Sequence, residues 1–282
     1  MSSPEHHDSG SDSDGGAATP LGAFEHIEYM ERDWIGLLTI NRPAVHNAIS
    51  LVTMGELDRV LHWLETNAQV KAVVITGAGE RVFVSGGDLK DFARIETHEA
   101  AVAMSRRMQG LMARFEALPM PVIGAINGDC LGGGCEVALA ADVRIVSETA
   151  HFGFKQVTLG ITPAWGGLPR LVRLIGRARA LMLTASGETI GAIEAERIGL
   201  AEKVVAPGDV LPAAMELARS IAANPALAVR TIKQMVNHSG AASGEEAAAF
   251  EANLFARTWV SDDHQEALAA RKEKRTPHFR GR

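Results

Sequence analysis

Two glycine-rich segments of this 282-residue chain could each present backbone amides to a negatively charged oxygen atom. Gly132, Gly133 and Gly134 stand where a helix is predicted to begin, and free N–H groups and the helix dipole favour negative charge there. Gly86 and Gly87 offer a second stretch of backbone without covering side chains. Two amides that converge on one oxygen form an oxyanion hole, which stabilises a thioester enolate. Taken singly, each segment is explained at least as well by a tight turn or close packing.

Glu136 lies three residues beyond Gly133, about one turn further along the same helix face. A carboxylate at this position could reach the carbon next to an activated carbonyl and act as a general acid or base. Alternatively, a glutamate in the first turn stabilises the helix dipole by about 0.3–1 kcal/mol. The position of Glu136 alone leaves both interpretations open.

The cysteines, histidines and remaining glycines give no metal, disulfide or dinucleotide pattern. Cys130 and Cys135 lie five residues apart, a spacing that suits neither a disulfide framework nor a metal knuckle. The ten histidines are scattered, without the helical i, i+4 pair of zinc ligands. Gly77 and Gly79 lack the third glycine of a dinucleotide-binding motif. We predict no metal and no cofactor apart from any that a substrate carries.

Composition indicates a globular protein with enough chain to bury a core. The sequence is 46% hydrophobic and 22% charged, which excludes wholesale disorder. A net charge of -6 without a long basic run argues against a nucleic-acid or membrane-surface partner. No apolar run approaches the roughly 18 residues of a membrane span. The first twenty residues are acidic and rich in serine and glycine rather than signal-like, so we predict a cytoplasmic location.

The periodicity of the apolar residues predicts strands that alternate with helices, and hence a mostly parallel sheet. Helical spacing is clear after Ser50, which can cap a helix. Strands are predicted at 34–40, 70–76, 122–126 and 142–146, with helices at 51–64, 101–115 and 133–141 between them. After Gly166 one strand is expected, at 202–205, among helices at 171–181, 210–223, 226–236, 245–259 and 262–274.

Four motifs in this order and spacing resemble the crotonase superfamily, the enoyl-CoA hydratase/isomerase family. They are NRPAVHNAIS at 41–50, FVSGGDLK at 83–90, NGDCLGGGCEVALAAD at 127–142 and GITPAWGGLPR at 160–170. The stretch AARKEKRTPHF, which ends at Phe279, is similar to the family's closing motif. The resemblance implies an α/β crotonase (ClpP-like spiral) fold built from ββα repeats, with an α-helical C-terminal region. We expect a disordered tail at 1–22, the α/β core with the acyl-CoA site at 23–205, and a helical oligomerisation region at 206–282.

The resemblance also implies roles for individual residues. The two oxyanion-hole amides map onto Gly87 and Gly133, and Glu136 matches a catalytic acid or base of the family's hydratases. The family's second glutamate is Gln156 in this chain. An amide can orient water or substrate, but it cannot exchange a proton at neutral pH, and losing one general acid or base costs about 10²–10⁴ in rate.

The implied reaction is hydration of a 2-enoyl-CoA, with two alternatives left open. Trp165, together with the missing second glutamate, resembles the family's ethylmalonyl-CoA decarboxylase branch, so the enzyme could decarboxylate a substituted malonyl-CoA. Trp165 could narrow the acyl pocket, or it could be a core aromatic residue. The other alternative is a non-catalytic family member that binds acyl-CoA or RNA.

Further family positions concern coenzyme A, which enters as part of the substrate. Val45, Asp88, Leu89, Lys90 and Lys274 are the implied coenzyme A contacts, whereas Ala44 replaces a lysine of the family. Asp142 and Arg170 are expected to form structural ion pairs. The resemblance implies a homotrimer or a dimer of trimers, with an acyl-CoA thioester as the ligand and no nucleic-acid or membrane partner.

Overall fold

The computed structural model describes residues 21–240 and 243–281. Most of the tail predicted at 1–22 therefore lies outside the described residues. Of its last two residues, Leu21 packs against the edge of the core, and its carbonyl oxygen accepts a hydrogen bond from Arg59.

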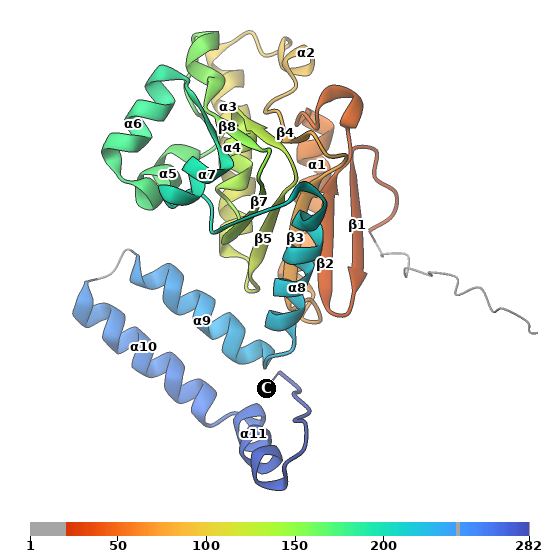
Figure 1. The fold of residues 1–282 in the computed structure, drawn as a ribbon, viewed down its shortest axis with the longest axis vertical. Helices are drawn as coiled ribbons and strands as arrows, with labels where there is room; N and C mark the ends of the chain where they lie inside the picture. The colour runs from red at the N-terminus through yellow and green to blue at the C-terminus, as the bar shows by residue number, and fades with distance from the viewer. Residues whose placement is uncertain (1–20, 241–242, 282) are drawn as a thin grey trace, which may run out of the picture.

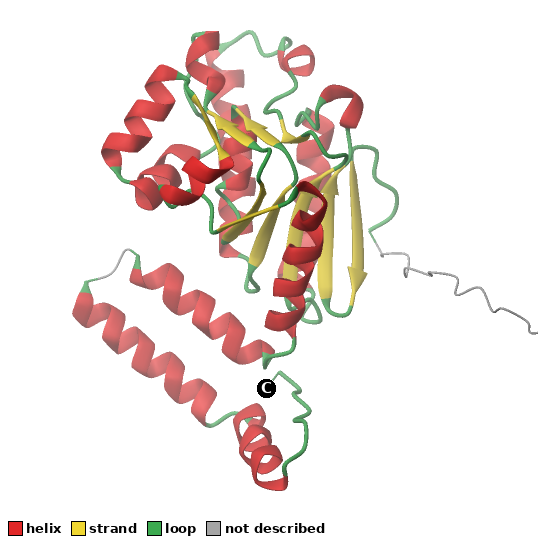
Figure 2. Cartoon of the chain, in the orientation of Figure 1, coloured by secondary structure: helices red, strands yellow, loops and turns green. Residues whose placement is uncertain are grey.

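A large sheet lies at the centre of the fold, with helices on both sides of it (Figures 1 and 2). Its six strands lie in the order β1 (Ile27–Arg32), β2 (Ile35–Ile40), β3 (Ala72–Gly77), β5 (Val122–Ile126), β7 (Val143–Ser147) and β10 (Lys203–Val205). Strands β1 and β2 are antiparallel, and every other neighbouring pair is parallel. The parallel arrangement predicted from the strand–helix alternation is confirmed.

A second, smaller sheet contains strands of three residues each. Its order is β4 (Val82–Val84), β6 (Asp129–Leu131), β8 (His151–Gly153) and β9 (Thr189–Gly191). Strands β4, β6 and β8 are mutually parallel, whereas β9 runs antiparallel to β8.

The chain builds both sheets by repeating one unit. Each unit gives its first strand to the large sheet, its second strand to the small sheet, and then forms helices. The units are β3–β4 followed by α2 (Leu89–Phe92) and α3 (His98–Ala117), β5–β6 followed by α4 (Gly133–Ala138), and β7–β8 followed by η2 (Lys155–Leu159), α5 (Gly167–Ile175) and α6 (Arg177–Ser186). This arrangement confirms the predicted fold of ββα repeats.

Helices cover both faces of the large sheet. Helix α1 (Leu51–Thr66) begins at Ser50, whose hydroxyl accepts a hydrogen bond from the Thr53 amide, a cap that stabilises a helix by about 1 kcal/mol. Helices α1 and α3 share the main apolar core with one face of the sheet. On the other face, α8 (Val210–Ala222) packs its alanines against β2, β3 and β5; Figure 1 shows it crossing the sheet.

The last three helices lie away from the two sheets (Figure 1). They are α9 (Ala226–Ser239), α10 (Gly244–Trp259) and α11 (Asp262–Glu273). No residue of α10 is fully buried, and Phe255, Trp259 and Val260 are exposed. The remaining short elements are η1 (Pro43–Val45), α7 (Ala192–Arg197) and η3 (Pro207–Asp209). Among the residues that the structure describes, no helix is both long enough and apolar enough to cross a bilayer.

The structure corrects several predicted elements. Within the described residues, regular secondary structure begins with β1 rather than with the strand predicted at 34–40. The helix predicted to run to about Ala141 ends at Ala138 after six residues. The helix predicted at 171–181 is two helices, because Gly176 separates them with a φ of +79°. The three-residue strands of the small sheet were not predicted, since such short apolar runs lack a detectable period.

Candidate active site

Three segments of the candidate site each follow one strand of the small sheet. Gly86 and Gly87 follow β4, Gly132 and Gly133 follow β6, and Gln156 follows β8. Neighbouring parallel strands end at the same edge of a sheet, which brings the segments that follow them together. The residues of these segments line one cavity of about 160 Å³. The small sheet, which was missed at the sequence level, is therefore what assembles the site.

The Gly87 amide points away from its neighbouring strand-like segment. Ile49 and Gly87 form a parallel β-bridge, in which Ile49 N donates to Gly86 O at 2.8 Å and Asp88 N donates to Ile49 O at 2.9 Å. Because the bridge uses the carbonyl before Gly87 and the amide after it, the N–H of Gly87 itself lies on the opposite side. Gly87 lines the cavity, so this amide is a candidate donor to a ligand.

The Gly133 amide is the second candidate donor. Gly133 is the first residue of α4, where an N–H has no acceptor within the helix. A Cβ atom added at Gly86, whose φ is +110°, would lie 3.1 Å from the Gly133 nitrogen, so the two loops are in close contact. Packing explains Gly134 instead, since its Cβ would lie 1.8 Å from Val84 O.

Glu136 is almost completely buried, with 1% of its surface exposed, and lines the same cavity. Its Oε1 accepts hydrogen bonds from Gln156 Nε2 at 3.1 Å and Ala164 N at 3.2 Å. Its Oε2 accepts from the amides of Trp165 and Gly167, both at 2.8 Å. Burial raises the pKa of this carboxyl above its ordinary value, although the four hydrogen bonds oppose the shift. A raised pKa in a cavity suits a group that exchanges protons.

Gln156 is buried beside Glu136, and its amide is only half satisfied. Its Nε2 donates to the carboxylate, whereas its Oε1 is buried and finds no donor within residues 21–240 and 243–281. An unpartnered buried acceptor is costly and uncommon in folded proteins. Gln156 thus lies beside Glu136 with one buried acceptor that a ligand in the cavity could satisfy.

Trp165 is both a core aromatic residue and part of the cavity wall, the two alternatives that its sequence position left open. Only 4% of its surface is exposed, and it belongs to the main apolar core. It also lines the cavity. A Cβ atom added at Gly133 would lie 2.3 Å from Cζ3 of the indole ring, so the ring packs directly on this glycine.

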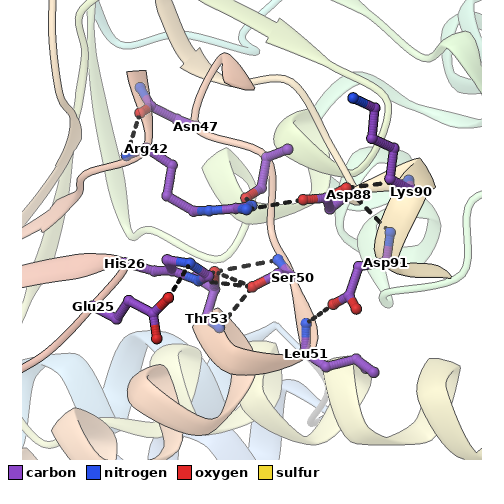
Figure 3. Close-up of polar contacts among 11 residues, drawn as sticks. Glu25, His26, Arg42, Asn47, Ser50, Leu51, Thr53, Asp88, Lys90 and Asp91 are labelled. Carbon is purple, nitrogen blue, oxygen red and sulfur yellow. Dashed lines mark hydrogen bonds and ion pairs between the residues drawn. The ribbon is translucent and has the colours of Figure 1, made fainter. Parts of the chain in front are cut away.

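A polar network fixes the loop that carries Gly87 (Figure 3). Arg42 Nη2 lies 2.9 Å from Asp88 Oδ2, and Asp88 also accepts hydrogen bonds from the amides of Lys90 and Asp91 as the N-cap of α2. Asp91 Oδ2 in turn accepts from Leu51 N at 2.7 Å. The Asp88 carboxylate is thus occupied by protein donors.

The other predicted coenzyme A contacts lie at the surface. Leu89 is 63% exposed and lines the cavity; Val45 and Lys90 are exposed but are not among the described residues that line it. Lys274 is the C-cap residue of α11 and is not among the described residues that line the cavity. A cation that sequence reasoning missed is Lys155, which lines the cavity and donates through Nζ to Gly187 O at 2.7 Å.

The expected structural ion pairs are confirmed. Asp142 Oδ2 lies 2.7 Å from Lys233 Nζ, and Arg170 Nη2 lies 2.8 Å from Glu116 Oε2. Cys130 and Cys135 are free thiols buried in the core.

Comparison with known proteins places the fold and the site in context. The profile of the family described as Enoyl-CoA hydratase/isomerase matches residues 31–282. A short-chain-enoyl-CoA hydratase from Clostridium acetobutylicum is 40% identical over 246 residues, which cover 86% of this chain and 92% of the relative. A crotonyl-CoA hydratase from Syntrophomonas wolfei is 36% identical over 257 residues, covering 91% and 98%. The crystal structure of an enoyl-CoA hydratase from Bacillus anthracis superposes with a TM-score of 0.87 at 36% identity, covering 92% of this chain and all of that one.

Proposed function

The chain belongs to the enoyl-CoA hydratase/isomerase family, and from this premise we propose that it hydrates a 2-enoyl-CoA thioester to a 3-hydroxyacyl-CoA. The observation that carries the proposal is the meeting of the Gly87 and Gly133 backbones with Glu136 in one cavity. The names of the relatives favour this hydro-lyase activity over decarboxylation of a substituted malonyl-CoA and over non-catalytic binding.

The two glycine amides would bind the thioester oxygen. Hydrogen bonds to this oxygen draw electrons from the conjugated double bond, which makes C3 electrophilic and stabilises the enolate that forms when water adds. Fixed backbone donors are effective because they need no reorganisation during the reaction, and losing one such donor costs about 10²–10³ in rate.

Glu136 would be the proton-transfer group. Its carboxylate would accept a proton from water while the water oxygen bonds to C3 and the π electrons move onto the thioester oxygen. The protonated carboxyl would then give its proton to C2 as the enolate collapses, which restores the carboxylate. Water is thereby added in full across the double bond, and a single carboxylate suffices for both transfers.

Gln156 would orient the water or the substrate rather than exchange a proton. Its contact with Glu136 supports this role, because anything bound next to the carboxylate lies beside the Gln156 amide as well. Hydration with one carboxylate should therefore be slower than with the family's pair, by a factor within the range of about 10²–10⁴ that one general acid or base supplies.

Binding of the coenzyme A part is assigned to the rim of the cavity. Val45, Leu89 and Lys90 of the same chain would contact it, and Lys274 would reach it from a neighbouring subunit, with the lysines facing its phosphates. Asp88 would act through the backbone of its loop. No further cofactor is proposed.

We also propose assembly as a homotrimer or dimer of trimers through the C-terminal helices. The exposed apolar side chains Phe255, Trp259 and Val260 support an interface there. Light scattering coupled to size-exclusion chromatography tests this: a monomer would contradict it. A cytoplasmic location remains a prediction.

The proposed reaction is tested by the loss of enoyl-thioester absorbance when purified protein is mixed with crotonyl-CoA, beside the Gln156→Glu variant. We expect the unmodified protein to form 3-hydroxybutyryl-CoA and the variant to form it faster. An unmodified protein without turnover, with activity in the variant alone, would mean that the site serves other chemistry; malonyl-type thioesters would then be tested.

A further inference from the structure

We propose that Trp165 sets the acyl-chain length of the substrate and restricts it to about four carbon atoms. This inference rests on the proposed action on acyl-CoA thioesters. It assigns to one side chain the discrimination between short and long acyl groups.

The first support is the position of the indole ring relative to the donor amide. A Cβ atom on Gly133 would lie 2.3 Å from Cζ3 of Trp165 and 2.6 Å from both Cε3 and Cη2. The six-membered part of the ring therefore covers the Cα of the residue whose N–H is assigned to the thioester oxygen. An acyl group bound at that amide lies next to the ring from its first carbon onward.

The second support is that the ring is held in place. The Trp165 amide donates to Glu136 Oε2 at 2.8 Å, and the Gly167 amide donates to the same oxygen. The Trp165 backbone is thus tied to the group assigned to C2, and the side chain is 4% exposed within the apolar core. The Trp165 ring is thus held between Gly133 and Glu136. It acts as a rigid wall of the cavity, because moving it would disturb the packed core.

The third support is the size of the cavity. Its volume is about 160 Å³, and a cavity of about 150 Å³ holds one benzene molecule. A crotonyl group has about five non-hydrogen atoms, so it fits together with the attacking water. A decenoyl group, with about eleven, exceeds this volume, so its outer carbons must either leave the cavity or displace part of its wall.

The test compares kcat/KM for crotonyl-CoA, octenoyl-CoA and decenoyl-CoA in the unmodified protein, Trp165→Ala and the control Trp34→Ala. Trp34 is exposed at the turn between β1 and β2, outside this cavity. Since one methylene in a pocket changes discrimination by about 10–200-fold, we expect Trp165→Ala to raise the decenoyl-to-crotonyl ratio at least tenfold and Trp34→Ala to leave it unchanged. A ratio that stays within twofold in Trp165→Ala would overturn the proposal. If that variant does not fold, Trp165→Phe should give a smaller shift in the same direction, and no shift would overturn the proposal equally.

A binding measurement separates this inference from the proposed reaction. Dissociation constants for butyryl-CoA and decanoyl-CoA, which lack the reactive double bond, should favour butyryl-CoA in the unmodified protein and shift toward decanoyl-CoA in Trp165→Ala. That outcome without turnover of crotonyl-CoA would support the role of Trp165 and reject hydration. Turnover of crotonyl-CoA with no change in chain-length preference would support hydration and reject the role of Trp165.

Discussion

Gln156 Nε2 donates a hydrogen bond to Glu136 Oε1 over 3.1 Å and thereby completes the coordination of this buried carboxylate. Each carboxylate oxygen already accepts two hydrogen bonds, which matches the roughly four lone-pair sites of the group. A water molecule that passes its proton to Glu136 must therefore replace one donor. Three of the donors are backbone amides, and Gln156 is the one side chain, which can rotate. In the proposed reaction, the Gln156 side chain is therefore the donor that would move aside for the attacking water and then orient it.

The pH dependence of hydration should report the raised pKa of Glu136. The carboxyl acts first as a base, so kcat/KM for crotonyl-CoA should be low when it is protonated and should rise with pH through a pKa above 4.5. The hydrogen bond from Gln156 lowers this pKa. Replacing Gln156 with Met should therefore move the acidic limb to higher pH.

The matched control for this shift is Gln109→Met. Gln109 donates a hydrogen bond to the carbonyl oxygen of Ala164, whereas Glu136 binds the amide of the same residue. Among the described hydrogen bonds, Gln109 makes none to Glu136. Its replacement should leave the limb in place. An acidic limb that stays fixed or moves to lower pH in Gln156→Met would show that this hydrogen bond does not act on the titrating group.

Gly133→Ala should reduce kcat/KM by about 10²-fold or more, the range for loss of one oxyanion-hole donor. The added methyl group would lie 2.3 Å from the Trp165 ring, so the backbone or the ring must move. Combining the substitution with Trp165→Ala should recover part of the activity.

Gly110→Ala is the control, since nothing lies within 4 Å of its Cβ position in α3. This variant should gain about 0.5–1 kcal/mol in stability and keep full activity. Equal activities in Gly133→Ala and Gly110→Ala would refute the role of the Gly133 amide.

Arg42→Met should lower kcat about tenfold and destabilise the fold by about 1–2 kcal/mol, because it breaks a charged hydrogen bond between side chains that are each 14% exposed. Burial acts against ionisation of Asp88, but the hydrogen bonds from Arg42 and the α2 amides hold its pKa below 3.8. The stabilisation is thus present above the ordinary pKa and is lost as pH falls through the lowered one.

Urea unfolding and steady-state kinetics check this prediction together. Arg197→Met, which removes an exposed pair with Glu194, should change neither stability nor rate. A stability loss in Arg42→Met with unchanged kcat would mean that the network supports the fold without positioning the Gly87 loop.

The sequence predicted the parts of this molecule that depend on long periodic segments or on dense motifs. Helices α1, α3 and α8 have a clear helical apolar period, the strands β3, β5 and β7 are short, mostly apolar runs, and the four motifs identified the fold. Periodicity could not reveal the three-residue strands that assemble the site. Nor could it reveal that Asp88 pairs with Arg42 or that Trp165 packs on Gly133, because these contacts join residues far apart in the chain.

The most direct test of the account is the rate of crotonyl-CoA hydration by Glu136→Gln. The amide is close in shape to the carboxylate. With its oxygen facing the Trp165 and Gly167 amides, its NH₂ group could donate to Oε1 of a flipped Gln156 amide, and the Ala164 amide alone would lose its acceptor. We therefore expect the variant to keep its folded binding site, which an unchanged dissociation constant for butyryl-CoA would show. We predict that kcat falls by about 10²–10⁴-fold, the loss expected when the proton-transfer group is removed. A variant that folds, binds butyryl-CoA and hydrates crotonyl-CoA within a few-fold of the unmodified rate would contradict the assignment of Glu136.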